Sequence, residues 1–301
     1  MSVAEAGVTR KAVERTTRGQ QVRELGFRAA LLFSLSFGFL ALAVLLIDVL
    51  LDGASLISYD FLAKFPSQIF PERSGISSSL QGTLYLMVLT AVFIVPVGLA
   101  TAVYLEEYAD RERWWNQLVE VNIQNLAAVP SIVYGILGLT FIVRGALDLG
   151  AVLLAGALTL GLLVLPVVIV VAREAIRAVP SSIREGSMAL GAAQWQTIWK
   201  QTLPGALPGI ATGVILALSR AIGETAPLIL VGAIAFVPFN PDPNPAEGQY
   251  SAIPITILSS VSNPDRDVQA LASGAIIVLL AILLVMNAGA VYLRNRYEQK
   301  W

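Results

Sequence analysis

Long apolar blocks recur along this chain, and each is long enough to cross a lipid bilayer. The hydrocarbon core of a bilayer is ~30 Å thick, so a helical span needs roughly 20 mainly apolar residues. With 56% apolar and 14% charged residues, the chain is predicted to be an all-α membrane protein of about six transmembrane helices. The blocks lie at 27–51, 80–105, 121–143, 151–172, 209–237 and 268–293. The first is too long for a signal-peptide core, so we expect it to remain as an uncleaved span.

Lysine and arginine are distributed unequally between the segments that connect these spans. If both termini are cytoplasmic, fifteen of the 20 basic residues face the cytoplasm and four face the outside. Cytoplasmic segments of membrane proteins carry such an excess. The bias predicts a cytoplasmic tail at 1–26, which we expect to be a solvated or surface-lying helix. It also predicts external loops at 52–79 and 238–267, a cytoplasmic segment at 173–208 and a cytoplasmic end at 294–301.

Composition narrows the chemistry that the chain can perform. It contains neither cysteine nor histidine, which excludes disulfides, thiol nucleophiles, Ser-His triads and zinc sites of the Cys/His type. Its formal net charge of −1 argues against a nucleic-acid partner, which would need clustered Lys and Arg outside the spans. No lysine stands in the Gly-Lys-Ser/Thr order of a Walker A loop, so the chain does not hydrolyse ATP by that route.

The cytoplasmic segment 173–208 is predicted to form two short helices, because charged and amide residues interrupt it too often for a span. Ser182 and Glu185 fit a capping box that begins the first helix. Gly191 would end that helix, and Pro204 would close the second.

The second of these helices carries one mostly apolar stripe, formed by Trp195, Ile198, Trp199 and Thr202. Such a stripe must pack against the lipid surface, against this protein's own spans or in a groove of a partner. Periodicity alone leaves all three open.

The fifth block contains an arginine, Arg220, ~16 Å along a helix counted from Gly209 and so close to the bilayer midplane. An arginine there costs ~2.5 to 3.5 kcal/mol on insertion scales, so we expect it to face the bundle interior with a partner. Glu224 lies one turn away on the same face, as do Gly213 and Ala217. Two interpretations stay open: an ion pair that keeps helices in register, or a guanidinium that binds a crossing oxyanion while the glutamate orients it.

Three amides, Asn122, Gln124 and Asn125, stand at the entrance of the third block. They either line a path or make ordinary hydrogen bonds between helices.

Several stretches carry a family resemblance. EGSMALG at Glu185–Gly191, with Leu203 and Pro204 at the expected distance, resembles the cytoplasmic signature of ABC importer permeases. This chain departs from the signature where Gly186 and Ser187 replace two alanines and Gln201 replaces an isoleucine.

Other stretches resemble, more narrowly, the A-type permeases of the bacterial phosphate-specific importer. They are PVGLATAVYLEEYA at 96–109, NLAAVPSIVYGILGL at 125–139 and SRAIGETAPL at 219–228. Ala226, Pro227 and Leu228 favour the A type over the similar C type. The resemblance covers residues 80–293.

The resemblance implies a non-catalytic, multi-pass subunit with the type I ABC importer permease fold, in the lipid of the bacterial inner membrane. The implied partners are a second permease of the C type, two ATPase subunits that use the ATP, and a periplasmic phosphate-binding protein. No cofactor would be bound by this chain. The helix that docks on an ATPase would comprise Glu185, Gly186, Ser187, Ala189, Leu190, Gly191 and Trp195. The phosphate pathway would comprise Asn125, Ser219, Arg220, Glu224 and Thr225.

Other functions remain to be weighed. A permease for a different oxyanion fits the same residues. An ion-coupled secondary transporter would explain Arg220 and Glu224, but the internal repeat and the relay of buried acids typical of that class are absent from the sequence. An intramembrane enzyme would need a nucleophile with its base or a metal, and without His and Cys little remains to build one.

Overall fold

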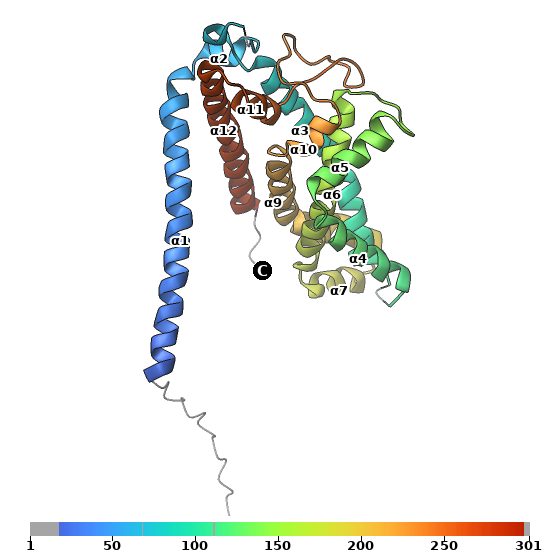
Figure 1. The fold of residues 1–301 in the computed structure, drawn as a ribbon. Helices are drawn as coiled ribbons and strands as arrows, with labels where there is room; N and C mark the ends of the chain where they lie inside the picture. The colour runs from blue at the N-terminus through green and yellow to red at the C-terminus, as the bar shows by residue number, and fades with distance from the viewer. Residues whose placement is uncertain (1–17, 68, 111, 298–301) are drawn as a thin grey trace, which may run out of the picture. The chain divides into compact units, whose positions relative to one another are not determined.

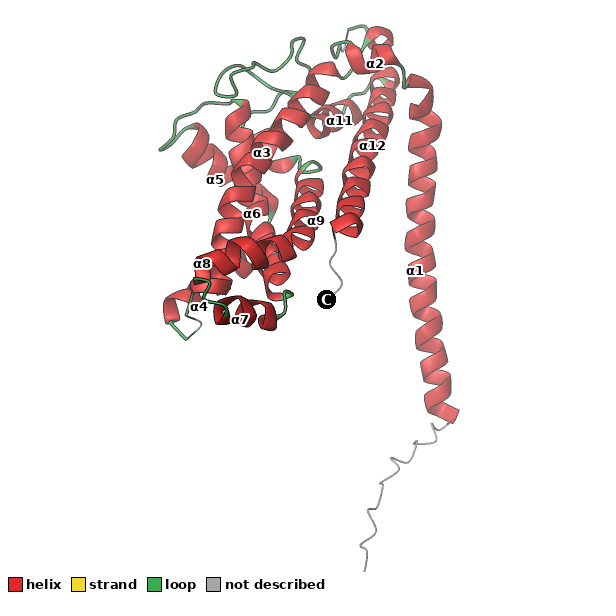
Figure 2. Cartoon of the chain, turned by 180° about the vertical axis from the view of Figure 1, so that it is seen from behind, coloured by secondary structure: helices red, strands yellow, loops and turns green. Residues whose placement is uncertain are grey.

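The computed structural model describes residues 18–67, 69–110 and 112–297. Every regular element in this part of the chain is helical (Figure 2), which confirms the predicted all-α class. Five helices are long and apolar enough to cross a membrane, and a bent helix pair makes six if it counts as one span. The chain divides into two units, residues 1–48 and 49–301.

The first unit contains most of α1 (Arg18–Gly53), a single helix of 36 residues (Figure 1). It begins well before the predicted span at residue 27. Its large apolar side chains are mostly exposed, among them Phe33 and Phe37, whose rings stack on each other. A helix with apolar side chains on all sides is typical of a membrane span. Of the tail expected as a separate helix, residues 18–26 belong to α1 and residues 1–17 lie outside the described part.

The second unit is built around α3 (Ser77–Val103) and α6 (Leu153–Arg177), with α9 (Leu203–Ala221) and α12 (Arg266–Tyr297) beside them (Figure 1). Glycines let these helices approach closely. A Cβ atom at Gly98 would lie 2.8 Å from Val168 Cγ1, and one at Gly213 would lie 2.1 Å from Val171 Cγ1. Small residues at helix contacts are typical of membrane bundles, where packing has to replace the hydrophobic effect.

The prediction of one continuous third span, 121–143, is wrong. The structure has α4 (Trp114–Ala127) and α5 (Ser131–Leu137), which continues as a π-helix, η4 (Gly138–Val143). The two parts meet at an angle of 108°. The bend lies at Pro130, which precedes α5. Proline lacks a backbone donor and disfavours helical geometry in the residue before it, so the helix breaks there.

The fifth span also differs from the expectation of 209–237. Helix α9 ends at Ala221, and a short helix, α10 (Ala226–Leu230), follows after a break. Pro227 lies in the first turn of α10, where its missing N–H is tolerated, whereas in a continuous helix its ring would meet the carbonyl of Gly223. Membrane helices tolerate such breaks where the freed backbone lines a cavity or is buried in protein.

The segments predicted as external loops contain short helices. The first holds η1 (Ala54–Leu56), α2 (Tyr59–Ala63) and η2 (Pro71–Arg73), and the second holds α11 (Ile253–Val261). Buried hydroxyl groups fasten the second loop to α3: Ser79 Oγ lies 3.0 Å from Ser251 Oγ, and Thr83 Oγ1 accepts a hydrogen bond from Ile253 N at 2.9 Å. These segments are therefore an ordered cap on the bundle.

Candidate functional site

Arg220 lies in the last turn of α9, not in the middle of a span. Its side chain is 49% exposed, and its Nε atom is 3.7 Å from Oε1 of Glu224, which lies beyond the end of the helix and is 18% exposed. The free carbonyl groups at the end of a helix favour a cation. The glutamate is thus the expected partner of Arg220, but the pair is loose and open on one side.

The expectation that Arg220 faces the bundle interior together with Gly213 and Ala217 is wrong. Gly213 and Ala217 are buried, and Ala221 continues their row. Arg220 lies on the side of α9 that also carries Leu216, which is 55% exposed. Rotation does not explain the difference, because Gly213 and Arg220 are seven positions apart and lie within about 20° of each other around a helix. The two differ in their position along α9: Gly213 packs against Val171 of α6, whereas Arg220 lies in the last turn of the helix.

A second polar contact joins this turn of α9 to the last helix. The hydroxyl of Ser219 donates to Oδ1 of Asn287 in α12 at 3.0 Å. Asn287 played no part in the sequence prediction, although an amide inside the apolar run of the last block was a signal that could have found it.

Helix α5 of the bent pair packs against α10, the short helix that follows Arg220: a Cβ atom at Gly135 would lie 2.8 Å from Pro227 Cα. The hydroxyl of Tyr134 in α5 donates to the Leu126 carbonyl oxygen in α4 at 2.9 Å. Asn125 is the exposed residue next to Leu126, and it makes no recorded contact with Arg220. Thr225 is partly exposed, and its carbonyl accepts from Ile229 N in the first turn of α10.

These groups give a guanidinium whose donors are largely unused, at a break in a membrane helix. Such a group can hold two oxygens of an oxyanion at once. Exposure to lipid would be costly for an arginine. The exposed side of Arg220 therefore requires a partner protein or a water-filled path next to it.

Segment 173–208 has the predicted helix, turn and helix. Helix α7 (Ser181–Ala189) is followed by Gly191 with φ of +88° and by α8 (Gln194–Thr197). This φ value lies in the left-handed region, which confirms the turn predicted at Gly191. The turn projects Leu190, which is 91% exposed.

Most of the residues predicted to dock on an ATPase are exposed, namely Glu185, Gly186, Ala189, Leu190, Gly191 and Trp195. Ser187 instead faces inward and shares a hydrogen bond of 2.9 Å with Thr197. Ser187 therefore holds the two short helices together, and the others form an open surface.

Two predictions about the ends of these helices are wrong. Pro180 precedes α7, and Ser182 lies inside the helix and makes no capping bond. Pro204 does not end the second helix, because a π-helix, η5 (Ile198–Thr202), joins α8 to α9 and places the proline in the first turn of α9. There proline needs no hydrogen-bond partner.

The apolar stripe of the second helix is divided. Ile198 and Thr202 are buried against this protein's own spans, whereas Trp195 and Trp199 are 57% and 66% exposed. Two of its four side chains thus remain available to lipid or to a partner.

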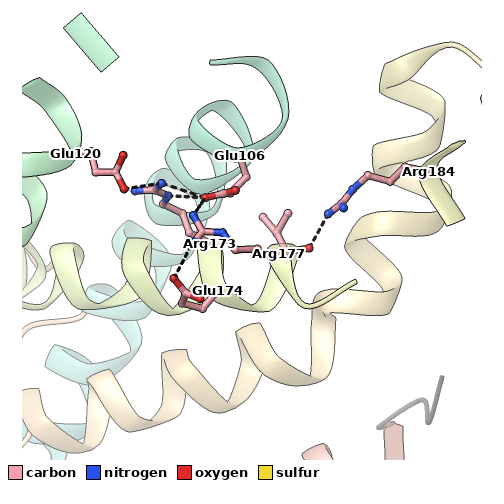
Figure 3. Close-up of polar contacts among 7 residues, drawn as sticks. Glu106, Glu120, Arg173, Glu174, Arg177 and Arg184 are labelled. Carbon is pink, nitrogen blue, oxygen red and sulfur yellow. Dashed lines mark hydrogen bonds and ion pairs between the residues drawn. The ribbon is translucent and has the colours of Figure 1, made fainter. Parts of the chain in front are cut away.

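A network of ion pairs holds α3, α4 and α6 together (Figure 3). Arg173 of α6 places Nη2 3.0 Å from both Glu106 Oε1 and Glu120 Oε1, and Arg177 lies 2.6 Å from Glu106. Glu106 is in the π-helix η3 (Tyr104–Tyr108) that ends α3, and Glu120 is in α4. Three helices are therefore tied together by the nearly buried guanidinium of Arg173.

The next residue, Glu107, connects the same π-helix to α7 and α8. Its Oε1 accepts from Arg184 Nε in α7 at 3.0 Å, and its carbonyl accepts from Gln194 Nε2 in α8 at 2.6 Å. Arg184 also donates to the carbonyl of Ile176 at 2.6 Å. The sequence prediction did not include this network, although two adjacent acids at the end of a span were a signal for it.

Comparison with known proteins agrees with this arrangement. The family model described as "Binding-protein-dependent transport system inner membrane component" matches residues 94–299. The chain is 34% identical to "Phosphate transport system permease protein PstA 1" of Mycobacterium tuberculosis, covering 75% of this chain and 73% of that protein. It is 30% identical to "Probable ABC transporter permease protein YqgI" of Bacillus subtilis, covering 84% and 88%.

Solved structures share the fold. One chain of a bacterial alginate ABC transporter, in complex with an alginate pentasaccharide-bound periplasmic protein, superimposes with a TM-score of 0.66 at 17% identity, covering 92% of this chain and 96% of the other. One chain of the MetNI methionine ABC transporter, in an inward-facing conformation, gives a TM-score of 0.59 at 16% identity, covering 74% and 97%.

Proposed function

This chain belongs to the family of binding-protein-dependent transport system inner membrane components, and from that premise we propose that it is the permease subunit of an ATP-driven importer of inorganic phosphate. The substrate follows from the similarity to proteins named as phosphate permeases together with the exposed guanidinium at the end of α9. Arg220 carries the proposal, because a multiply charged oxyanion needs a cation to cross a layer of low dielectric constant.

The loose geometry of the pair suits transport better than tight binding. At 3.7 Å the glutamate of the pair is beyond hydrogen-bond distance, so the donors of Arg220 remain available. Glu224 lowers the net attraction for an anion, and a transported ion must be able to leave as well as enter. Ser219, Thr225 and Asn125 lie on the same path.

The chain acts with partners in this proposal. A second, C-type permease covers the open side of Arg220, a periplasmic binding protein delivers phosphate, and two ATPase subunits supply the energy. The surface around Leu190 and Trp195 docks on an ATPase, since both side chains are exposed at a cytoplasmic turn. The protein lies in the bacterial inner membrane with both termini, segment 173–208 and the α3–α4 connection in the cytoplasm, as the charge bias indicates.

Uptake of radiolabelled phosphate into reconstituted vesicles tests the proposal. The full complex should take up phosphate when the ATPase subunits face the vesicle interior and ATP is enclosed there. It should not take up phosphate without ATP. Sulfate in excess should compete weakly. Uptake that needs an ion gradient and no ATP would support a secondary transporter, and stronger competition by another oxyanion would change the substrate.

A further inference from the structure

Asn287 is a polar side chain in an apolar helix, and the part of the chain that the structure describes uses one of its oxygen lone pairs and neither of its N–H donors. It follows Leu283, Leu284, Val285 and Met286 in α12. Its Oδ1 atom accepts the hydrogen bond from Ser219 at 3.0 Å. Among the residues that the structure describes, its Nδ2 atom has no recorded hydrogen-bond partner.

The contact with Ser219 decides which end of the amide is free. Because the hydroxyl donates to the carbonyl oxygen, the two N–H donors of Asn287 point away from that bond. Ser219 immediately precedes Arg220, so the α9–α12 contact brings an amide to the turn that carries the guanidinium. Asn287 is itself partly exposed, so a ligand can reach its amide donors.

We propose that Asn287 is a substrate-binding residue of the anion pathway: its amide donates to the translocated oxyanion beside Arg220, and Ser219 holds the amide in that orientation. The inference rests on the proposed function of the chain. A neutral donor adds a directed hydrogen bond to an acceptor oxygen without adding charge, so it contributes to binding and still allows release. An ordinary contact between two helices is the competing explanation.

One substitution separates the two explanations. In Asn287→Asp the carboxylate still accepts the hydrogen bond from Ser219, so a contact that only joins helices would persist. The same change replaces the donors with a negative charge, which repels an anion. If the amide contacts phosphate, Asn287→Asp should lower the kcat/KM of phosphate uptake by about a hundredfold, the loss of one charge-assisted bond plus repulsion.

Three further variants complete the measurement in the reconstituted complex. Asn287→Ala should raise the KM for radiolabelled phosphate about tenfold with little change in kcat, as expected for one lost hydrogen bond to a charged ligand. Ser219→Ala keeps the amide but loses its orientation and should have a smaller effect on KM. Met286→Leu, an apolar exchange at the neighbouring position, is the control and should behave as wild type.

The outcomes are distinguishable. If the unaltered complex takes up phosphate and Asn287→Asp does so equally well, the inference is wrong and the proposed function stands. If the unaltered complex does not transport phosphate, the proposed function itself fails. Should Asn287→Asp not assemble, Asn287→Ala decides: a tenfold rise in KM supports the pathway role, and a KM within about twofold of wild type contradicts it.

Discussion

Arg173 and Glu106 form a buried ion pair near the ends of α6 and α3, in which two guanidinium nitrogens each lie 3.0 Å from the same carboxylate oxygen. Only 8% and 3% of these side chains are exposed. They connect the end of α6 to the end of α3, and Arg177 adds a second cation to the same carboxylate. The coupling segment is anchored one residue further along, at Glu107.

Removing one partner of this pair should destabilise the protein strongly. In Glu106→Gln, two arginines lose their shared carboxylate, although Arg173 keeps Glu120 and Arg177 keeps Glu174. Breaking a buried pair typically costs ~3 to 5 kcal/mol, and we expect the lower end of that range because each arginine retains one partner. Thermal unfolding in detergent would measure the loss. Glu174→Gln is the control, since its partner contact with Arg177 is exposed and should matter little. Equal midpoints for the two variants would show that the network is not structural.

The link through Glu107 predicts a different defect. Glu107→Gln should leave the fold intact, because one neutral hydrogen bond can replace the ion pair with Arg184, but the coupling helix should be held less firmly. We expect more ATP hydrolysed per phosphate taken up, measured on the same vesicles. Glu112→Gln removes the same charge from an exposed loop position and serves as the control. An unchanged ratio in both variants would contradict a transmitting role for Glu107.

Gly191 offers a test of the coupling segment with a matched control. A side chain at φ of +88° is strained by ~1 to 2 kcal/mol, so Gly191→Val should distort the turn although nothing lies within 4 Å of the new Cβ. Gly186→Ala also enters open space, but within a helix, where alanine is favoured. We expect the first variant to insert yet lose co-purification with the ATPase, and the second to retain it. Normal transport by Gly191→Val would contradict a role for this turn in docking to the ATPase.

Substitutions at Arg220 should separate the pathway role from a register role. Arg220→Gln should abolish phosphate uptake while the complex still assembles, since the loose pair with Glu224 contributes little to stability at this exposure. Arg220→Lys should retain part of the activity, because an ammonium group lacks the bidentate fork. Glu224→Gln should lower both KM and kcat, as phosphate binds more tightly and leaves more slowly. Failure of Arg220→Gln to assemble would favour the register role.

The absence of cysteine allows a direct test of orientation. A single cysteine at Gln249, exposed between α10 and α11, should react with an impermeant thiol reagent added outside intact cells. A single cysteine at Ala189, exposed at the end of α7, should react only after the membrane is opened. The opposite pattern would place the coupling surface on the wrong side for an ATPase.

The sequence alone was sufficient for the all-α class, for the positions of most apolar spans and for the turn at Gly191. Each of these depends on a short stretch of chain: apolar length for a span, and the left-handed geometry that glycine adopts for the turn. Arg220 and Glu224 could be paired from the sequence for the same reason, because four positions separate them.

Tertiary structure decided where the helices end and which groups meet. The apolar sequence continues past Pro130 and Ala221, so hydropathy could not reveal that the helices end near these residues. Such breaks are possible because neighbouring parts of the protein satisfy the freed backbone groups. Arg220 accordingly lies at an open helix end and not inside the bundle. The pairs Arg173–Glu106 and Ser219–Asn287 join positions 67 and 68 residues apart. Which polar groups come within 3 Å of one another depends on how whole helices pack. The sequence near either residue does not predict such a contact.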